Sequence, residues 1–186
     1  MPRSSIDRLS SLISYSAASV YARVTEESTA TPGPIVEETE MDFTFQQYEE
    51  SAQAIRARLG GFAPKVAMIL GSGLGYLGDQ VEGAVTVPYG EIPYFKSSTA
   101  PGHKGRLVFG TLEGQRVAVM QGRMHHYEGY SYEEVSYAVR VLRLLGCDTL
   151  IVTNAAGCVH TGWQAGDLML ITDHIKLFSQ SPLRGE

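Results

Sequence analysis

The alternation of apolar and polar positions predicts two amphipathic helices. In the first, Thr44 and Gln47 have the spacing of a capping box, and Gly60-Gly61 ends an apolar stripe. That stripe consists of Phe45, Tyr48, Ala52, Ile55 and Leu59. In the second helix, Ser131 and Glu134 repeat the capping spacing, and the stripe continues to a glycine. Its members are Val135, Ala138, Val139, Leu142 and Leu145.

Short apolar runs between and after these helices predict strands. One buried strand leads into the glycine-rich residues 71–75, and two runs that flank Glu113-Gly114 predict a hairpin. The expected strands are Lys65–Leu70, Leu107–Leu112, Val117–Gln121, Asp148–Thr153 and Asp167–Thr172. Because helices interleave with apolar strands, we expect a layered α/β fold with a mixed, mostly parallel sheet.

The first 40 residues show no such periodicity. They are rich in Ser, Thr and Ala, and they end in a Pro-Gly-Pro segment and three glutamates. We expect a disordered or extraneous extension over residues 1–40 and a folded domain over residues 41–186. The first 25 residues carry Arg3, Arg8 and Arg23 against a single acid, so an organelle-targeting peptide is an alternative.

Composition narrows the class of protein. Apolar residues make up 44% of the chain and charged residues 19%, as is typical of a globular protein. The net charge of -5 argues against binding to nucleic acid or to an anionic membrane. No apolar run approaches the roughly 18 residues of a membrane span. Cys147 and Cys158 have no metal-ligand spacing, so we expect reduced thiols in a cytoplasmic protein.

The glycine-rich segment 71–75 is the first candidate site. Glycines after a buried strand let consecutive backbone N–H groups point at one anion, and the Ser72 hydroxyl adds a donor. A tight strand-to-helix turn is the structural alternative. Residues 73–78 also satisfy the dinucleotide pattern G-x-G-x-x-G, with Glu91 as the ribose-binding acid. No apolar stripe follows them, so the crossover helix of a dinucleotide fold is not expected.

Basic residues gather between positions 96 and 123. Five of them stand against Glu113 alone, and this local charge of +4 suits a small anion better than a polymer. The members are Lys96, Lys104, Arg106, Arg116 and Arg123. Ordinary solvated surface cations are the alternative. His103 lies between glycines, which favours a mobile loop that carries a titratable donor.

Residues 121–129 follow a strand and carry the third candidate set. If the strand's period of two continues, Arg123, His125 and Tyr127 project from the same side. A guanidinium binds phosphate oxygens through two parallel N–H bonds, the imidazole adds a donor, and the phenol can contact a sugar or ring. A metal site at His125-His126 lacks supporting carboxylates or cysteines, so we expect no metal and a structural His126.

The fourth candidate is the turn at residues 154–157. It follows an apolar strand, and its small side chains let backbone amides approach a ligand at the carboxyl edge of the sheet. A plain turn with Asn154 in a left-handed conformation is the alternative.

Five segments together resemble the trimeric purine nucleoside phosphorylase family over roughly residues 45–186. They are GSGLG (71–75), STAPGHKGRLVFG (98–110), QGRMHHYEGY (121–130), TNAAG (153–157) and GDLMLITDHI (166–175). The resemblance implies a three-layer α/β/α domain and cleavage of purine nucleosides by inorganic phosphate, in purine salvage. It also implies a homotrimer that needs no cofactor beyond phosphate as co-substrate.

The same resemblance assigns roles to individual residues. Ser72, Arg123, His125 and the Ala155 amide are expected to hold phosphate. His103 is expected to be the mobile donor near phosphate and ribose, and Tyr127 to contact the sugar. His125 and His103 are the expected catalytic residues.

The chain departs from the family in two respects. Cys158 and His160 stand where the family usually has Gly and Asn. The family's pattern continues past Glu186 into the residues that recognise the base, so we expect residues 41–186 to be the N-terminal two thirds of the domain. A fragment of an active enzyme and a non-catalytic, shortened remnant both remain open. The related methylthioadenosine phosphorylase is the alternative activity, and base specificity is not determined.

Overall fold

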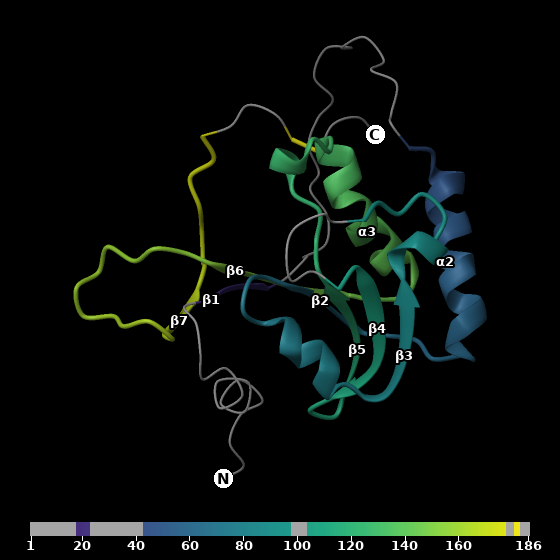
Figure 1. Cartoon of the computed structure of the whole chain (residues 1–186), viewed down its shortest axis with the longest axis horizontal. Coiled ribbons are helices and arrows are strands. Elements are labelled where there is room, and N and C mark those ends of the chain that lie inside the picture. Colours follow the sequence, from purple (N-terminus) through teal and green to yellow (C-terminus); the bar gives the residue numbers. More distant parts are fainter. Residues whose placement is uncertain (1–17, 23–42, 98–103, 178–180, 183–186) are drawn as a thin grey trace, which may run out of the picture.

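The computed structural model describes residues 18–22, 43–97, 104–177 and 181–182. Within them one mixed sheet has the strand order β3-β4-β5-β2-β6-β1-β7 (Figure 1). The strands are β1 (Ala18–Ala22), β2 (Val66–Leu70), β3 (Glu82–Pro88), β4 (Arg106–Leu112), β5 (Gln115–Gln121), β6 (Thr149–Ala155) and β7 (Leu168–Leu170). The helices are α2 (Phe45–Leu59) and α3 (Tyr132–Leu144), with short 3-10 helices η1 (Gly75–Gln80), η2 (Tyr89–Glu91) and η3 (His126–Glu128). None of the described helices is long and apolar enough to cross a membrane.

Both α-helices begin at the predicted capping boxes. Gln47 donates its backbone N–H to the Thr44 hydroxyl at 3.3 Å, and the Gln47 side chain accepts from the Thr44 N–H at 2.7 Å. The same reciprocal pair joins Ser131 and Glu134 at 3.1 and 2.8 Å. Gly60 ends α2 in the left-handed conformation, with φ of 55°. The two predicted helices are therefore confirmed, with their expected starts.

The buried face of α3 is rotated from the predicted stripe. Val135 and Val139 are only half-buried, whereas Tyr137 is fully buried. Its ring stacks on Tyr48 of α2, with centroids 4.6 Å apart, and its hydroxyl donates to the Gln47 carbonyl at 2.8 Å. A tyrosine enters the core when its hydroxyl finds partners there, and an apolar stripe drawn from aliphatic residues misses it.

The predicted hairpin is confirmed as β4 and β5. Glu113 and Gly114 form its two-residue connection, with φ of 48° and 74°. Positive φ at both positions is the geometry of a type I′ turn, which matches the twist of the flanking strands. The sequence analysis did not predict β3, which pairs antiparallel with β4 and is mostly exposed.

Three parallel strands form the centre of the sheet. β2 pairs in parallel with β5 on one side and with β6 on the other. The antiparallel pairs are β3 with β4, β4 with β5, and β6 with β1. The α/β class and the mixed sheet are thus confirmed. β1 lies within the predicted extension and pairs with β6 and β7, while the rest of residues 1–40 lie outside the described part.

The sheet separates two apolar cores. Figure 1 shows α2 and α3 side by side on one face, where they cover alternate strand residues such as Ala67, Ile69 and Met120. The intervening residues, such as Met68 and Val119, face the other way and pack under Leu77 of η1. The expected three layers are present, and η1 is the helix that covers the second face among the described residues.

Candidate functional site

Three of the segments that carry candidate residues meet at one edge of the sheet. β2 ends just before Gly71, β5 ends two residues before Arg123, and β6 carries Thr153 near its end. The carboxyl ends of neighbouring parallel strands meet at the same edge, where open α/β sheets place their ligands. Contacts among these three residues join the three strand ends.

Thr153 is the centre of these contacts. Its carbonyl accepts from Arg123 Nη1 at 2.9 Å, and its hydroxyl accepts from the Gly71 N–H at 2.8 Å. The hydroxyl also donates to the Ile69 carbonyl at 3.3 Å, and the residue is only 3% exposed. The sequence analysis missed Thr153 as a site residue. Its signal is a hydroxyl residue near the end of an otherwise apolar strand.

A glycine is required at residue 71, because the end of β2 lies close to the backbone of β6 there. A Cβ atom at residue 71 would lie 2.4 Å from the Thr153 carbonyl oxygen and 2.9 Å from Asn154 Cα. The chain then turns back, with the Leu74 N–H donating to the Gly71 carbonyl at 3.2 Å and Gly73 at φ of 84°. Ser72 is exposed at the tip of this turn. The segment is therefore a tight turn. It places Ser72 directly after Gly71, the residue through which β2 contacts β6.

β6 is longer than predicted. It runs through Asn154 to Ala155, which lies opposite Ala18 of β1. The alternative of a plain turn with Asn154 in a left-handed conformation is wrong, because pairing with β1 keeps this backbone extended. Ala155 is exposed at the end of the strand.

β5 ends at the predicted residue. It does not continue through Arg123, His125 and Tyr127, as their projection from the same side would require. The strand ends at Gln121, Gly122 has φ of 103°, and Tyr127 lies in η3. The expected continuation of the strand is therefore wrong. The His125 and Tyr127 rings nevertheless stack, with centroids 4.8 Å apart and planes inclined by 22°. The tight turn of η3 thus keeps both rings together, and Tyr127 is 77% exposed.

Glu128 orients His125. One carboxylate oxygen accepts from the His125 backbone N–H at 2.8 Å and lies 3.0 Å from ring Nδ1. The Glu128 side chain is only 4% exposed. A buried carboxylate at Nδ1 favours the tautomer that carries its proton there and fixes the plane of the ring. The sequence analysis missed Glu128, although its spacing of three residues from His125 is that of a capping box.

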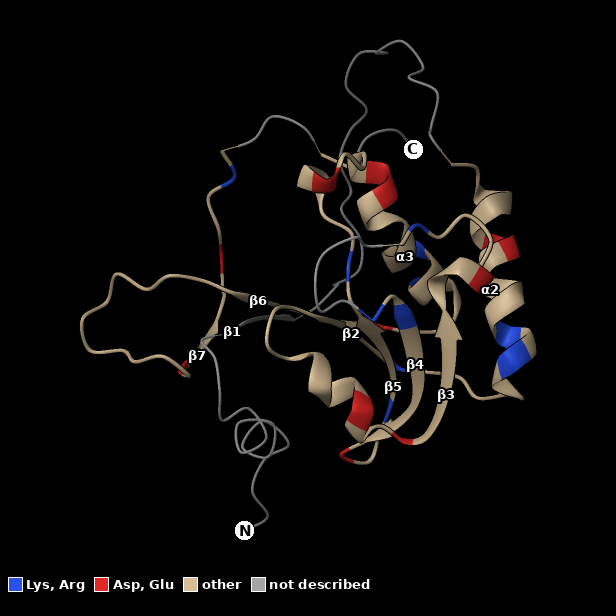
Figure 2. Cartoon of the chain, in the orientation of Figure 1, with Lys and Arg blue, Asp and Glu red and all other residues tan. Residues whose placement is uncertain are grey.

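Carboxylates from other parts of the chain neutralise much of the predicted basic stretch. Lys96 Nζ lies 3.2 Å from a Glu134 oxygen, and Lys104 and Arg106 both bind Asp79. In Figure 2 the acidic positions of α3 and η1 that pair with these cations are coloured red, and the basic start of β4 is blue. The expected local charge of +4 is wrong, because it counts residues in sequence and not in space. Arg123 is partly buried, and this burial lowers the pKa of its guanidinium, an effect that Tyr127 opposes.

His103 lies outside the described residues. Its neighbours on the C-terminal side are anchored beside β5, where the Gly105 N–H donates to the Gln121 carbonyl at 3.0 Å. Gly105 is also bonded to η2, because the Tyr89 N–H donates to the Gly105 carbonyl at 2.9 Å. The segment that follows His103 is therefore tied to the strand that leads to Arg123.

The rival interpretations do not fit this geometry. After the glycines the chain forms the 3-10 helix η1 and then β3, and Glu91 binds Arg58 on the other side of the sheet from η1, so the dinucleotide reading is contradicted. His126 Nδ1 donates to the Tyr130 carbonyl at 2.7 Å, and its ring stacks on Tyr132. In the described part of the chain no group of three or more His, Cys, Asp or Glu side chains could hold a metal ion.

A separate cavity of about 500 Å³ lies between α2, α3 and the amino end of β6. Its lining is mainly apolar and includes Tyr48, Val139, Leu142 and Leu150. Thr153 lies at the other end of β6, so this cavity is not part of the candidate site.

Comparison with known proteins identifies close relatives. Purine nucleoside phosphorylase 1 of Bacillus subtilis is 57% identical over 123 residues, which cover 66% of this chain and 45% of that protein. The Bos taurus purine nucleoside phosphorylase is 50% identical over 146 residues, covering 77% and 50%. Among solved structures, isoform 2 of the Schistosoma mansoni enzyme in complex with cytosine and ribose-1-phosphate matches with a TM-score of 0.61 and 38% identity. That match covers 66% of this chain and 43% of the other.

These relatives are each matched over a similar share of their length. The chain spans about half the length of the curated relatives it matches. The family model of the phosphorylase superfamily matches residues 65–186, which include every described residue of the candidate site. This match covers well over half of the chain, and the protein therefore belongs to the phosphorylase superfamily.

Proposed function

We propose that this protein is a purine nucleoside phosphorylase. It uses inorganic phosphate to convert purine ribonucleosides and deoxyribonucleosides into the free base and ribose or deoxyribose 1-phosphate. The observation that carries the proposal is the meeting of Gly71, Arg123 and Thr153, which joins a glycine turn, a guanidinium and a strand end at one edge. The relatives at about 50% identity, all named purine nucleoside phosphorylase, support the choice of reaction.

The proposed phosphate site uses donors from each strand end. Ser72 supplies a hydroxyl, Arg123 a guanidinium fork, and Ala155 a backbone amide. His125, oriented by Glu128, supplies Nε2, which donates to phosphate when the ring carries both protons, and His103 is the donor on the neighbouring segment. Tyr127, whose exposed ring stacks on His125, contacts the sugar.

These groups suit a reaction without a protein nucleophile. Cleavage of the glycosidic bond develops positive charge on the sugar, and a phosphate dianion held beside it stabilises that charge. A phosphate oxygen then forms the new bond to the anomeric carbon while the purine leaves with the electrons of the old bond. His125 and His103 are the proposed catalytic residues, because they hold the phosphate as its charge changes.

Several finer assignments belong to the same proposal. The reaction needs phosphate as co-substrate and no further cofactor, and the protein acts as a homotrimer in cytoplasmic purine salvage. Residues 41–186 form the N-terminal two thirds of the catalytic domain. The similarity to the trimeric family supports the trimer, and the two free cysteines support a reducing compartment.

The test is inosine cleavage by the 186-residue chain with and without phosphate, with ribose 1-phosphate as the measured product. We expect strict dependence on phosphate, since the attacking group is a phosphate oxygen. Arg123→Ala should lower the phosphate-dependent rate by about 10² to 10³. Arg116→Ala removes the same charge from the exposed start of β5 and should leave the rate unchanged. Equal cleavage without phosphate would indicate a hydrolase and contradict the proposal.

A further inference from the structure

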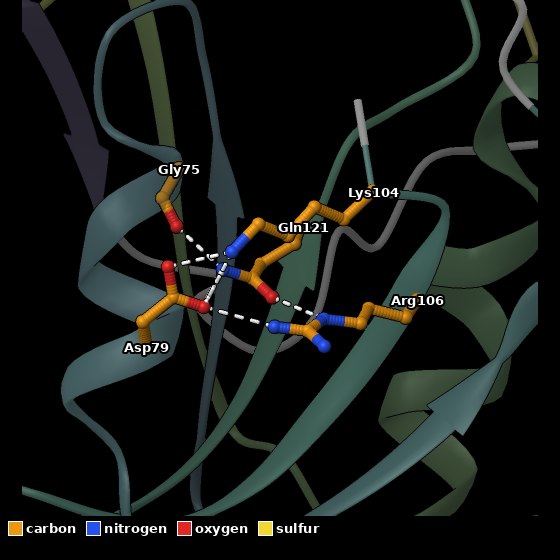
Figure 3. Close-up of polar contacts among 5 residues, drawn as sticks. All are labelled: Gly75, Asp79, Lys104, Arg106 and Gln121. Carbon is orange, nitrogen blue, oxygen red and sulfur yellow. Dashed lines mark hydrogen bonds and ion pairs between the residues drawn. The ribbon is translucent and has the colours of Figure 1, made fainter. Parts of the chain in front are cut away.

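A polar cluster lies beside the candidate site and belongs to none of its proposed roles. It joins Asp79 of η1, Lys104, Arg106 of β4 and Gln121 at the end of β5 (Figure 3). Lys104 Nζ lies 2.7 and 2.6 Å from the two Asp79 carboxylate oxygens, and Arg106 Nη2 lies 2.9 Å from one of them. One carboxylate therefore holds two cations that come from different segments.

Gln121 connects this cluster to the glycine turn. Its side chain is buried, with the residue 1% exposed, and its Oε1 accepts from Arg106 Nε at 2.6 Å. Because Arg106 can only donate, the amide is fixed with its nitrogen facing the other way. Gln121 Nε2 then donates to the Gly75 carbonyl at 2.5 Å and to Asp79 at 3.2 Å. The last residue of the glycine segment is thus bound to the end of β5.

Close packing reinforces these hydrogen bonds. A Cβ atom at Gly78 would lie 2.3 Å from the Gln121 side chain, so η1 lies directly against the buried amide. The Lys104 and Asp79 side chains are nearly half exposed. Ion pairs with that exposure contribute little to the stability of the fold. The main effect of the Asp79 contacts is therefore on where the bonded segments lie.

The bonded segments are those that carry the proposed phosphate ligands. Asp79 follows the turn that carries Ser72 by a few residues, Lys104 is the residue after His103, and Gln121 precedes Arg123 by two. Side-chain hydrogen bonds of Asp79 and Gln121 join the described parts of these segments to one another. A displacement of about 1 Å in such groups can lower the rate of a reaction by about 10².

We infer that Asp79 is a positioning residue for the oxyanion site. With Gln121, it ties Lys104, the start of β4 and the end of β5 that leads to Arg123 to the helix η1, which follows the Ser72 turn. This inference rests on the proposed function, because it requires phosphate to bind between those segments. The positioning role predicts that loss of the Asp79 carboxylate weakens phosphate binding, whereas its charge alone predicts the opposite change. Asp79→Asn removes a negative charge near a bound anion, which by charge alone would tighten phosphate binding.

The test measures binding of inorganic phosphate to the 186-residue chain by titration calorimetry. We expect Asp79→Asn to raise the phosphate Kd about tenfold and Lys104→Met to raise it by a similar factor. Asp79→Glu keeps the carboxylate and should restore most of the affinity. The matched control is Lys96→Met, which removes one cation of the same basic stretch from the separate pair with Glu134 and should leave Kd unchanged. Thermal melting of each variant should stay within a few degrees of the wild type.

The outcomes separate the two proposals. Phosphate affinity in Asp79→Asn that equals or exceeds that of the wild type, while Arg123→Ala loses it, overturns the positioning role and leaves the proposed function standing. If Asp79→Asn fails to fold, equal affinity of Lys104→Met and Lys96→Met overturns the role by itself. A wild-type chain that binds no phosphate overturns the proposed function and this inference together.

Discussion

At the scale of single residues, the site depends on one threonine and the glycine that faces it. Thr153 uses its hydroxyl for Gly71 and its carbonyl for Arg123, so it links the ends of β2 and β5 to β6. Buried hydroxyls of this kind are satisfied in both donor and acceptor capacity, as the further bond to the Ile69 carbonyl shows. The geometry of the site is set by groups that do no chemistry.

Gly71→Ala should therefore destabilise the protein. Its Cβ would meet the backbone of β6 at 2.4 Å, and a strand backbone cannot move aside as a flexible side chain can. We expect a loss of about 1 to 3 kcal/mol in the free energy of unfolding, measured by urea titration. Gly75→Ala is the control, because a Cβ there meets no atom within 4 Å and should change stability by less than about 0.5 kcal/mol. Equal losses in the two variants would show that the close approach of β2 and β6 is not the cause.

The sequence predicted residues of the site that stand out by type and missed those that act through packing. Ser72 and Arg123 follow strands and carry strong donors, so they are recognisable without a structure. Thr153 and Glu128 have weak sequence signals and Gln121 has none, because each gains its role from a contact across many residues or through a turn. The segment-wide count of positive charge failed for the same reason, since Asp79 lies outside the segment counted.

At the scale of elements, local sequence accounts for the helices and the hairpin. Capping boxes and a two-residue turn satisfy backbone groups within a few residues, and such interactions are visible in a single stretch of sequence. The strand β3, which the sequence analysis did not predict, depends on pairing with a segment distant in the sequence. β3 is mostly exposed and has little apolar pattern, and its assignment depends on β4, which lies on another segment.

Ser131→Ala should weaken the start of α3. The Glu134 N–H then loses its acceptor, and we expect a loss of about 1 kcal/mol in the free energy of unfolding. Ser131→Asp supplies an equivalent acceptor and should stay close to the wild type in the same urea titration. If aspartate is as destabilising as alanine, the cap is not the source of the stabilisation.

At the scale of the whole molecule, one of the two apolar cores encloses groups that must remain neutral. Burial raises the pKa of the Cys147 thiol and of the Tyr137 hydroxyl to about 12 each, and it also raises the pKa of Tyr89. All three belong to the core beneath α2 and α3. The folded state therefore keeps protons that an unfolded chain releases.

Stability should fall at alkaline pH as a result. In the unfolded chain a cysteine releases its proton near pH 9 and a tyrosine near pH 10, so between these values and pH 12 the unfolded state binds fewer protons. The free energy of unfolding then decreases as pH rises, and is fully retained below about pH 8. Urea titrations from pH 7 to pH 11 measure this slope. Cys147→Ala should make it shallower, whereas Cys158→Ala, at an exposed position, should not. A flat profile in the wild type would contradict the burial argument.

The two-residue connection at Glu113-Gly114 affects the order in which the strands of the sheet pair during folding. Strands joined by so short a turn find each other in microseconds, whereas β2 and β6 must close long loops before they pair. We expect the strand that leads to Arg123 to be in register early in folding and the Thr153 contacts to form when β6 docks. The Thr153 contacts of the candidate site would then be the last part of the described sheet edge to assemble, and a nascent chain would acquire them only after residue 155 had been synthesised.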